Sequence, residues 1–190
     1  MNSLRCFISI ELDPSVKKDV ENFIKKLLPN DYFRNVKWVK PDNMHITIAF
    51  LGETPLDSLT QISRVIENTS NKYDPFPINL RGSGFFPDKG EPRIFWIGIE
   101  KTPLLYAIKK DIDAGLNKLD INFDRKPFSP HLTLGRFKFV PNLKQSINLI
   151  DLPDFKASFM AEKISLVKSQ LFNDGPVYTD IFSCSLKKSV

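Results

Sequence analysis

Residues 41–48 read PDNMHITI, and residues 127–134 read PFSPHLTL. Both stretches have the form P-x-x-x-H-[IL]-T-[IL], and together they contain both histidines of the chain, His45 and His131. A match at this many positions between two distant stretches is typical of an internal repeat. We therefore expect two related lobes, each built around one copy of the motif.

Each copy has the pattern of a β-strand with one buried face. Successive side chains of a strand point to opposite sides, so His45 and Thr47 share a face while Ile46 points the other way. The same holds for His131 and Thr133. The pattern predicts two strands that bury apolar residues on one side. On the other side they present two imidazoles and two hydroxyls to a shared cleft.

This set of side chains fits the hydrolysis of a phosphodiester. Imidazole has an unperturbed pKa of about 6.5, so one ring can take a proton from water while the other protonates the leaving oxygen near neutral pH. Each threonine hydroxyl can donate a hydrogen bond to a phosphate oxygen. The two histidines and two cysteines are too widely spaced for a zinc site, so we expect neither a metal nor another cofactor. For either motif taken alone, a structural histidine is the alternative.

The composition is that of one ordinary folded domain. The chain has 190 residues, of which 42% are hydrophobic and 26% charged. Its net charge of +5 fits a phosphate or nucleic-acid ligand without requiring one. Two cysteines are too few for a disulfide scaffold, and we find neither a signal peptide nor a membrane-spanning run. We expect a single cytoplasmic, monomeric domain of two interleaved lobes over residues 1–190.

Hydrophobic periodicity and turn residues predict alternating strands and helices along the whole chain. The predicted helices lie between an Asp13 cap and Pro29, at 55–68, at 103–119 and, as a short one, at 141–150. A turn is predicted at 87–90. The predicted strands lie at 5–12, 36–39, 44–51, 76–86, 94–99, 131–137, 157–171 and 177–186.

The motif stretches resemble the 2H phosphoesterase superfamily, and within it the bacterial and archaeal RNA 2′,3′-cyclic phosphodiesterases, also called 2′-5′ RNA ligases. Besides HITIAFLGE at 45–53 and KPFSPHLTLGR at 126–136, the resemblance includes RCFISIEL at 5–12 and RIFWIG at 93–98. It covers nearly the whole chain. It implies an α+β, bilobal fold of two pseudo-symmetric lobes, each with a mixed or antiparallel sheet and helices, with an active cleft between them.

The resemblance also implies roles for four residues. His45 would be the proton donor, His131 the proton acceptor, and Thr47 and Thr133 would hold the phosphate. The implied reaction opens a terminal 2′,3′-cyclic phosphate on RNA to a 2′-phosphate. The implied partner is such an RNA, including tRNA halves that the family joins reversibly through a 2′-5′ linkage.

Other residues near the motifs are candidate substrate contacts. Arg136 suits a phosphate, although strand alternation puts it on the face opposite the histidine unless a bulge at Gly135 turns it. Lys126 lies just before the second motif strand. Phe50 and Phe128 would stack a base, with core packing as the alternative for both.

The motifs leave two other functions open. Other 2H enzymes cleave 2′-5′ oligonucleotides or ADP-ribose cyclic phosphate, and the motifs do not separate these activities because they bind the shared phosphate. A non-catalytic RNA-binding module would be a different class of protein. Intact motifs in both halves argue against that module.

Overall fold

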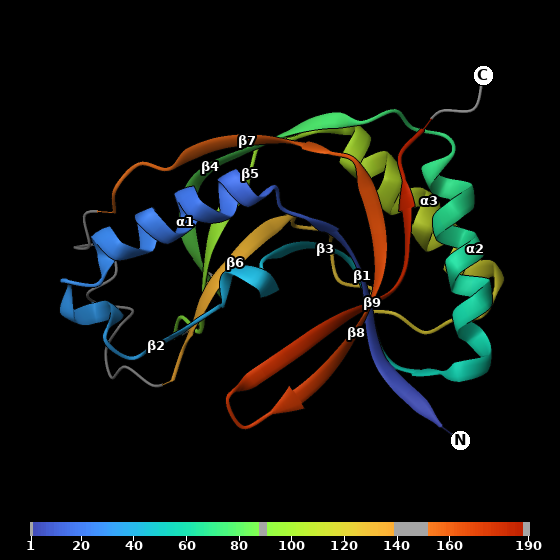
Figure 1. Ribbon diagram of the computed structural model, residues 1–190, viewed down its shortest axis with the longest axis horizontal. Helices are drawn as coiled ribbons and strands as arrows, with labels where there is room; N and C mark the ends of the chain where they lie inside the picture. Colours follow the sequence, from blue (N-terminus) through green and yellow to red (C-terminus); the bar gives the residue numbers. More distant parts are fainter. Residues whose placement is uncertain (1, 88–90, 139–151, 188–190) are drawn as a thin grey trace.

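One curled sheet of nine strands organises the computed structural model, which describes residues 2–87, 91–138 and 152–187 (Figure 1). The chain runs in order through β1 (Ser3–Glu11), α1 (Pro14–Leu27), η1 (Asp31–Phe33), β2 (Val36–Trp38), η2 (Pro41–Asn43), β3 (His45–Pro55), η3 (Leu56–Ser58), α2 (Leu59–Ser70), β4 (Phe76–Phe86), β5 (Ile94–Ile99), α3 (Pro103–Lys118), β6 (His131–Phe137), β7 (Lys156–Ala161), β8 (Lys163–Phe172) and β9 (Gly175–Ser185).

The sheet divides into two halves that meet at β3 and β6. The strand order is β7-β4-β5-β6-β3-β1-β8-β9, with β2 beside β6, and every described pair is antiparallel. We call β3, β1, β8 and β9 the terminal lobe, because it holds the first and last strands. We call β6, β5, β4 and β7, with β2, the central lobe. The two lobes form the α+β, bilobal arrangement that the sequence predicted.

Each lobe is covered by a helix that follows a strand of the other lobe. Helix α1 follows β1 of the terminal lobe, yet its Phe23 packs against Phe95 and Phe155 of the central lobe, with ring centroids 6.5 and 5.1 Å apart. Helix α3 follows β5 of the central lobe, yet it packs against β3 and α2 of the terminal lobe. Figure 1 shows α1 over one half of the sheet and α2 with α3 over the other. The two lobes therefore share their cores.

Local sequence signals explain where the helices begin. The Asp13 side chain accepts a hydrogen bond from the Ser15 backbone N–H at 2.8 Å, and Pro14 occupies the first turn of α1. The buried residues Val16, Val20 and Phe23 then recur at helical spacing on one face. Helix α2 begins later than predicted, at Leu59, because β3 continues to Pro55 and a short 3₁₀ turn follows it.

The predicted strand at 157–171 is wrong in its extent. It is two strands, β7 and β8, separated at Glu162. Strand β7 pairs with β4 in the central lobe, whereas β8 pairs with β1 in the terminal lobe, so the chain changes lobes between them. The predicted helix at 141–150 and the turn centred on 88–90 lie outside the described residues.

None of the helices in the described ranges is long and apolar enough to cross a membrane.

The exchanged helices predict that both lobes unfold together. Phe23→Ala removes a buried ring from a core to which both lobes contribute, and we expect it to lower the free energy of unfolding by about 3–5 kcal/mol. Trp38 and Trp96 lie on β2 and β5, so tryptophan fluorescence follows the central lobe, while far-UV circular dichroism follows the whole chain. The two urea transitions should coincide in the wild type and in the variant.

Leu28→Ala is the matched control, because this exposed leucine lies just beyond the end of α1. It should change stability by less than about 0.5 kcal/mol. Two separated transitions in the wild type would contradict the prediction of one domain over residues 1–190.

Candidate active site

The two motif strands meet at a single point of the described sheet. There, strands β3 and β6 pair through Ile46 and Leu132, both fully buried. Beyond Leu132, the same edge of β6 pairs with β2, while β3 stays paired with β1. In an antiparallel pair with this register, His45 comes across from Thr133 and Thr47 from His131. Each motif histidine therefore lies across from the threonine of the other motif.

A cavity of about 230 Å³ lies over the point where β3 and β6 pair. All four motif side chains line it, which agrees with the face that strand alternation assigned to them. The apolar partners in each motif are buried on the other side of the sheet. Further side chains around the cavity come from several elements: Phe7, Lys37, Trp38, Val39, Lys40, Asn43, Phe50, Arg136, Ser169, Asp174, Pro176 and Tyr178.

Both imidazoles are held in the same way. Nδ1 of His45 lies 2.7 Å from the backbone oxygen of Asn43, and Nδ1 of His131 lies 2.8 Å from that of Ser129. A carbonyl oxygen only accepts, so each Nδ1 donates and carries hydrogen. Each Nε2 is then left for exchange with a ligand. In His45, Nε2 lies 3.1 Å from Oγ1 of Thr47.

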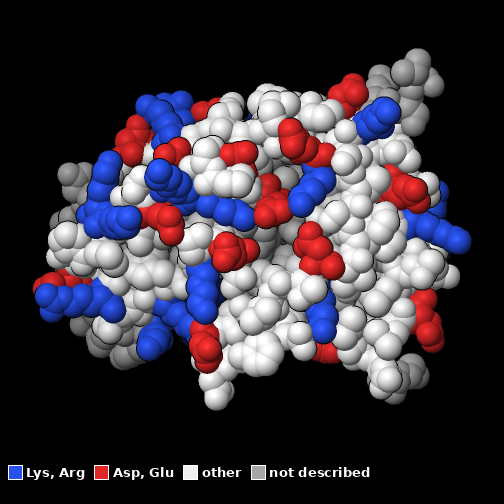
Figure 2. Space-filling model, in the orientation of Figure 1, with Lys and Arg blue, Asp and Glu red and all other residues white. Residues whose placement is uncertain are grey.

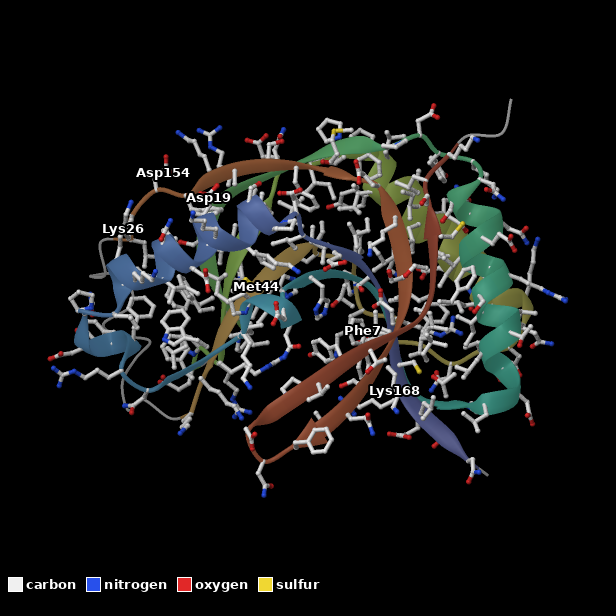
Figure 3. The ribbon with its side chains drawn as sticks, in the orientation of Figure 1. Phe7, Asp19, Lys26, Met44, Asp154 and Lys168 are labelled. Carbon is white, nitrogen blue, oxygen red and sulfur yellow. The ribbon has the colours of Figure 1, made fainter. Side chains whose placement is uncertain are left out.

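Aromatic rings enclose His45. The Phe7 ring stacks on its imidazole with centroids 4.5 Å apart, and the Tyr178 ring meets it edge-on at 5.3 Å. Phe7 lies on β1 beside the β8–β9 hairpin, which carries Tyr178 (Figure 3). Among the described rings, His131 contacts Phe86, whose centroid lies 5.0 Å away. The first imidazole is therefore the better shielded of the two.

This enclosure determines the protonation of both rings. Burial lowers the pKa of His45 from 6.5 to about 4, partly opposed by the hydrogen bond to Asn43 and reinforced by the nearby His131. Burial also lowers the pKa of His131, opposed by the bond to Ser129 and reinforced by the positive charge of Arg136. Without a bound anion, both imidazoles are therefore neutral at pH 7.

Two matching β-bulges bring one further residue from each strand into the cavity. The β1–β3 register passes over Ile48, and the β5–β6 register passes over Leu134. Each extra residue reverses the alternation that follows it. Phe50 and Arg136, each five positions after a motif histidine, therefore lie on the histidine side and line the cavity. The bulge that the sequence named as the condition for Arg136 is present, beside Gly135.

Gly135 is needed because β2 packs closely against β6 at this point. A Cβ at this position would collide with Cγ1 of Val36 and lie 3.2 Å from the Trp38 ring. Trp38 pairs with Gly135 across the two strands. The absent side chain thus lets β2 approach β6, and β2 contributes Lys37 and Trp38 to the cavity.

Two of the candidate contacts do not line the cavity. Lys126 is exposed and forms an ion pair with Asp124 at 3.0 Å. The Phe128 ring packs edge-on against Tyr106, with centroids 5.4 Å apart, and lies under the Lys109 ammonium. Phe128 is thus a packing residue, which was the alternative to base stacking that the sequence left open for this ring.

Sequence reasoning missed the cavity residues that come from outside the motif strands. Tyr178, Ser169 and Asp174 belong to the β8–β9 hairpin, more than 30 residues after the second motif. The short helix η2 contributes Asn43, whose Nδ2 donates to the Pro176 oxygen at 2.8 Å. No periodic signal marks these residues, because sheet pairing alone brings the hairpin to β1. Among the described residues, no three His, Cys, Asp or Glu side chains gather into a set that could hold a metal ion.

The chain matches a known family twice. The model of the LigT like Phosphoesterase family matches residues 10–96 and again residues 97–178, one copy for each histidine motif. Two relatives named RNA 2′,3′-cyclic phosphodiesterase illustrate the similarity. The one from Thermotoga maritima is 30% identical over 97% of this chain and 96% of its own length. The one from Methanocaldococcus jannaschii is 34% identical over 92% and 96%.

Solved structures share the fold. TT0787 of Thermus thermophilus superposes with a TM-score of 0.83 at 28% identity, covering 98% of this chain and all of its own. LigT of E. coli in complex with 3′-AMP superposes with a TM-score of 0.78 at 21% identity, covering 99% and 100%. The paired motifs, the bilobal fold and the double match lead to one conclusion: the protein belongs to the LigT-like branch of the 2H phosphoesterases.

Proposed function

We propose that this protein hydrolyses the terminal 2′,3′-cyclic phosphate of RNA to a 2′-phosphate, with His45 and His131 as its acid and base. The observation that carries the proposal is the arrangement of the two imidazoles. Each donates from Nδ1 to a backbone carbonyl, and both line one cavity with two threonine hydroxyls. Relatives that span almost the same length carry the name of this activity.

The reaction requires one proton transfer at each end of the phosphorus. Nε2 of His131 takes a proton from water, and the water oxygen forms the new bond to phosphorus. The bond from phosphorus to the ribose O3′ breaks, and Nε2 of protonated His45 supplies the proton to that oxygen. The phosphate stays on O2′. A 5′-hydroxyl in place of the water would form a 2′-5′ linkage by the same route.

The electrostatics of the empty cavity suit His131 as the base but oppose His45 as the acid. Burial, reinforced by the positive charge of Arg136, lowers the pKa of His131, which favours the neutral ring that a base needs. The acid, His45, must carry a proton, and its pKa of about 4 in the empty cavity opposes this. A bound phosphodiester brings a negative charge beside the ring and raises its pKa. We therefore propose that substrate binding protonates His45.

Thr47 and Thr133 would hold the phosphate oxygens, and Arg136 would pair with their charge. Arginine suits this task because its planar guanidinium donates two parallel hydrogen bonds to phosphate. Phe50 lines the same cavity, and its ring also lies against the Arg5 guanidinium, 4.8 Å from the ring centroid. We propose that Phe50 contacts the terminal nucleoside.

The setting of the reaction also stays a proposal. The partner would be RNA that ends in a cyclic phosphate, tRNA halves among the candidates, and the acting form would be a monomer. We propose a reducing compartment such as the cytoplasm, in which the free thiols of Cys6 and Cys184 would stay reduced.

Substitution of the histidines tests the acid–base assignment. His45→Ala and His131→Ala should each lower kcat/KM on a nucleoside 2′,3′-cyclic phosphate by ~10²-fold or more, because each removes one positioned proton transfer. The double variant should lose much less than the product of the two effects, since the rings act as a unit. Thr47→Ala and Thr133→Ala should be milder, each removing a charge-assisted hydrogen bond worth ~1.5–3 kcal/mol.

Phosphorus NMR should find the product phosphate on O2′, and circular dichroism should show that all variants are folded. Lys110→Ala, on the exposed face of α3, is the control and should keep wild-type turnover. Near-native turnover by both folded histidine variants would end the assignment.

The histidine pKa values can be measured directly, because the chain has only two imidazoles. In the free protein, proton NMR should find both below 6.5, with His45 near 4. A nucleoside 2′-phosphate should raise both values, so the complex binds protons that the free protein does not. His131→Asn leaves one imidazole and assigns the signals. A free His45 that titrates at or above 6.5 would contradict the proposed enclosure.

Chelation tests the prediction that no metal takes part. Turnover of the cyclic phosphate should be the same before and after dialysis against EDTA, because the proposed steps use only side chains of this chain. Loss of activity that Mg²⁺ or Zn²⁺ restores would show that the proposed mechanism is wrong.

A further inference from the structure

The tip of the β8–β9 hairpin exposes large apolar side chains next to the candidate active site. The hairpin turns between Phe172 and Gly175, and it projects from the body of the molecule (Figure 1). Phe172 is 56% exposed and Val177 50% exposed. These two side chains offer apolar surface to a ligand beside the candidate site.

A second depression, of about 340 Å³, lies between this tip and Lys40, the residue before η2. Phe172 and Val177 supply its apolar wall, and Lys40 supplies a positive charge. Lys40, Asp174 and Pro176 line both this groove and the cavity that holds the histidines. The two spaces are therefore neighbours with a shared wall. We call the second depression the hairpin groove.

The hairpin groove is held in a fixed place relative to the first histidine. The Asn43 amide donates to the Pro176 oxygen at 2.8 Å, and the Asn43 backbone oxygen accepts from Nδ1 of His45. One residue thus ties the hairpin to the ring that is proposed to protonate the leaving oxygen. A ligand that spans both spaces would meet a preformed surface.

The chemistry of the hairpin groove matches a nucleotide. An exposed aromatic face stacks a base of any sequence, and a lysine beside it pairs with a backbone phosphate. Figure 2 shows Lys and Arg side chains near the hairpin, interspersed with Asp and Glu. Asp174 is the one acidic residue among the described residues that line the groove, and its carboxylate can accept a hydrogen bond from a ribose 2′-hydroxyl.

We propose that the hairpin groove binds the nucleotide that precedes the one carrying the cyclic phosphate, with its base stacked on Phe172 and its connecting phosphate near Lys40. This inference rests on the proposed function and extends it. The terminal nucleotide occupies the histidine cavity, and its 5′-phosphate leads the chain across the shared wall. The natural substrate is then an RNA strand and not a cyclic mononucleotide.

The test compares two substrates that differ only by this nucleotide. They are a nucleoside 2′,3′-cyclic phosphate and the dinucleotide that ends in the same cyclic phosphate. For the wild type, kcat/KM should be higher on the dinucleotide. Phe172→Ala should lower the ratio of dinucleotide to mononucleotide kcat/KM about tenfold, which is within the range expected for loss of one stacked base. Phe172→Trp should keep the ratio, and Phe172→Leu should lose it because leucine has no flat face.

Leu171→Ala is the matched control. Leu171 is the neighbouring residue of the same hairpin and is 68% exposed, but it lines a different depression, together with Arg5 and Glu53. It should keep the wild-type ratio. The proposal is overturned if Phe172→Ala keeps the ratio, or if Leu171→Ala lowers it as much as Phe172→Ala does. It is also overturned if Phe172→Leu keeps the ratio as well as Phe172→Trp, since stacking would then not be the cause.

This experiment distinguishes a failure of the proposed function from a failure of the second nucleotide site. A wild type that turns over neither substrate contradicts the proposed function, and the inference that rests on it. A wild type that turns over both substrates with equal kcat/KM supports the proposed function and contradicts the second nucleotide site.

Discussion

The fold depends on the contact between Ile46 and Leu132, where the two halves of the sheet are joined. This pair is fully buried, and it is the one point at which β3 and β6 are paired in the described structure. Because side chains alternate along a strand, burying this pair turns the flanking histidine and threonine of both strands to the opposite face. One buried apolar contact therefore places four polar side chains together. Beyond this pair, β6 is paired with β2 and no longer with β3.

The departures from regular strand geometry extend this arrangement. In each motif strand, one bulged residue follows the His-x-Thr segment and returns the residue five positions after the histidine to the cavity. The terminal lobe places an aromatic ring there, Phe50, and the central lobe places a cation, Arg136. The same backbone device thus supplies two different contacts. Two halves with the same motif in this way form an asymmetric site.

The same asymmetry appears in the surroundings of the two imidazoles. Phe7 and Tyr178 cover His45, whereas His131 has the guanidinium of Arg136 as its charged neighbour. Burial is the main cause of the lowered pKa in both rings. A neighbouring group lowers each pKa further: the imidazole of His131 acts on His45, and the guanidinium of Arg136 acts on His131. We propose that a bound anion acts against these causes, so that protonation of the two imidazoles depends on whether the cavity is occupied.

The sequence by itself determined most of the elements, the repeat and the four motif residues, because these follow from local periodicity and from residue types that recur at fixed spacing. It also predicted the family and the bilobal α+β fold.

For Arg136 the sequence offered two faces and could not choose between them, because a bulge is set by pairing with another strand and leaves little local signal. It joined β7 and β8 into one strand, because only the choice of partners, β4 and β1, separates them. The exchange of α1 and α3 between the lobes and the place of the β8–β9 hairpin at the cavity were likewise decided by tertiary structure. Contacts between residues far apart in the chain form only when the whole sheet is assembled, and no single segment encodes them.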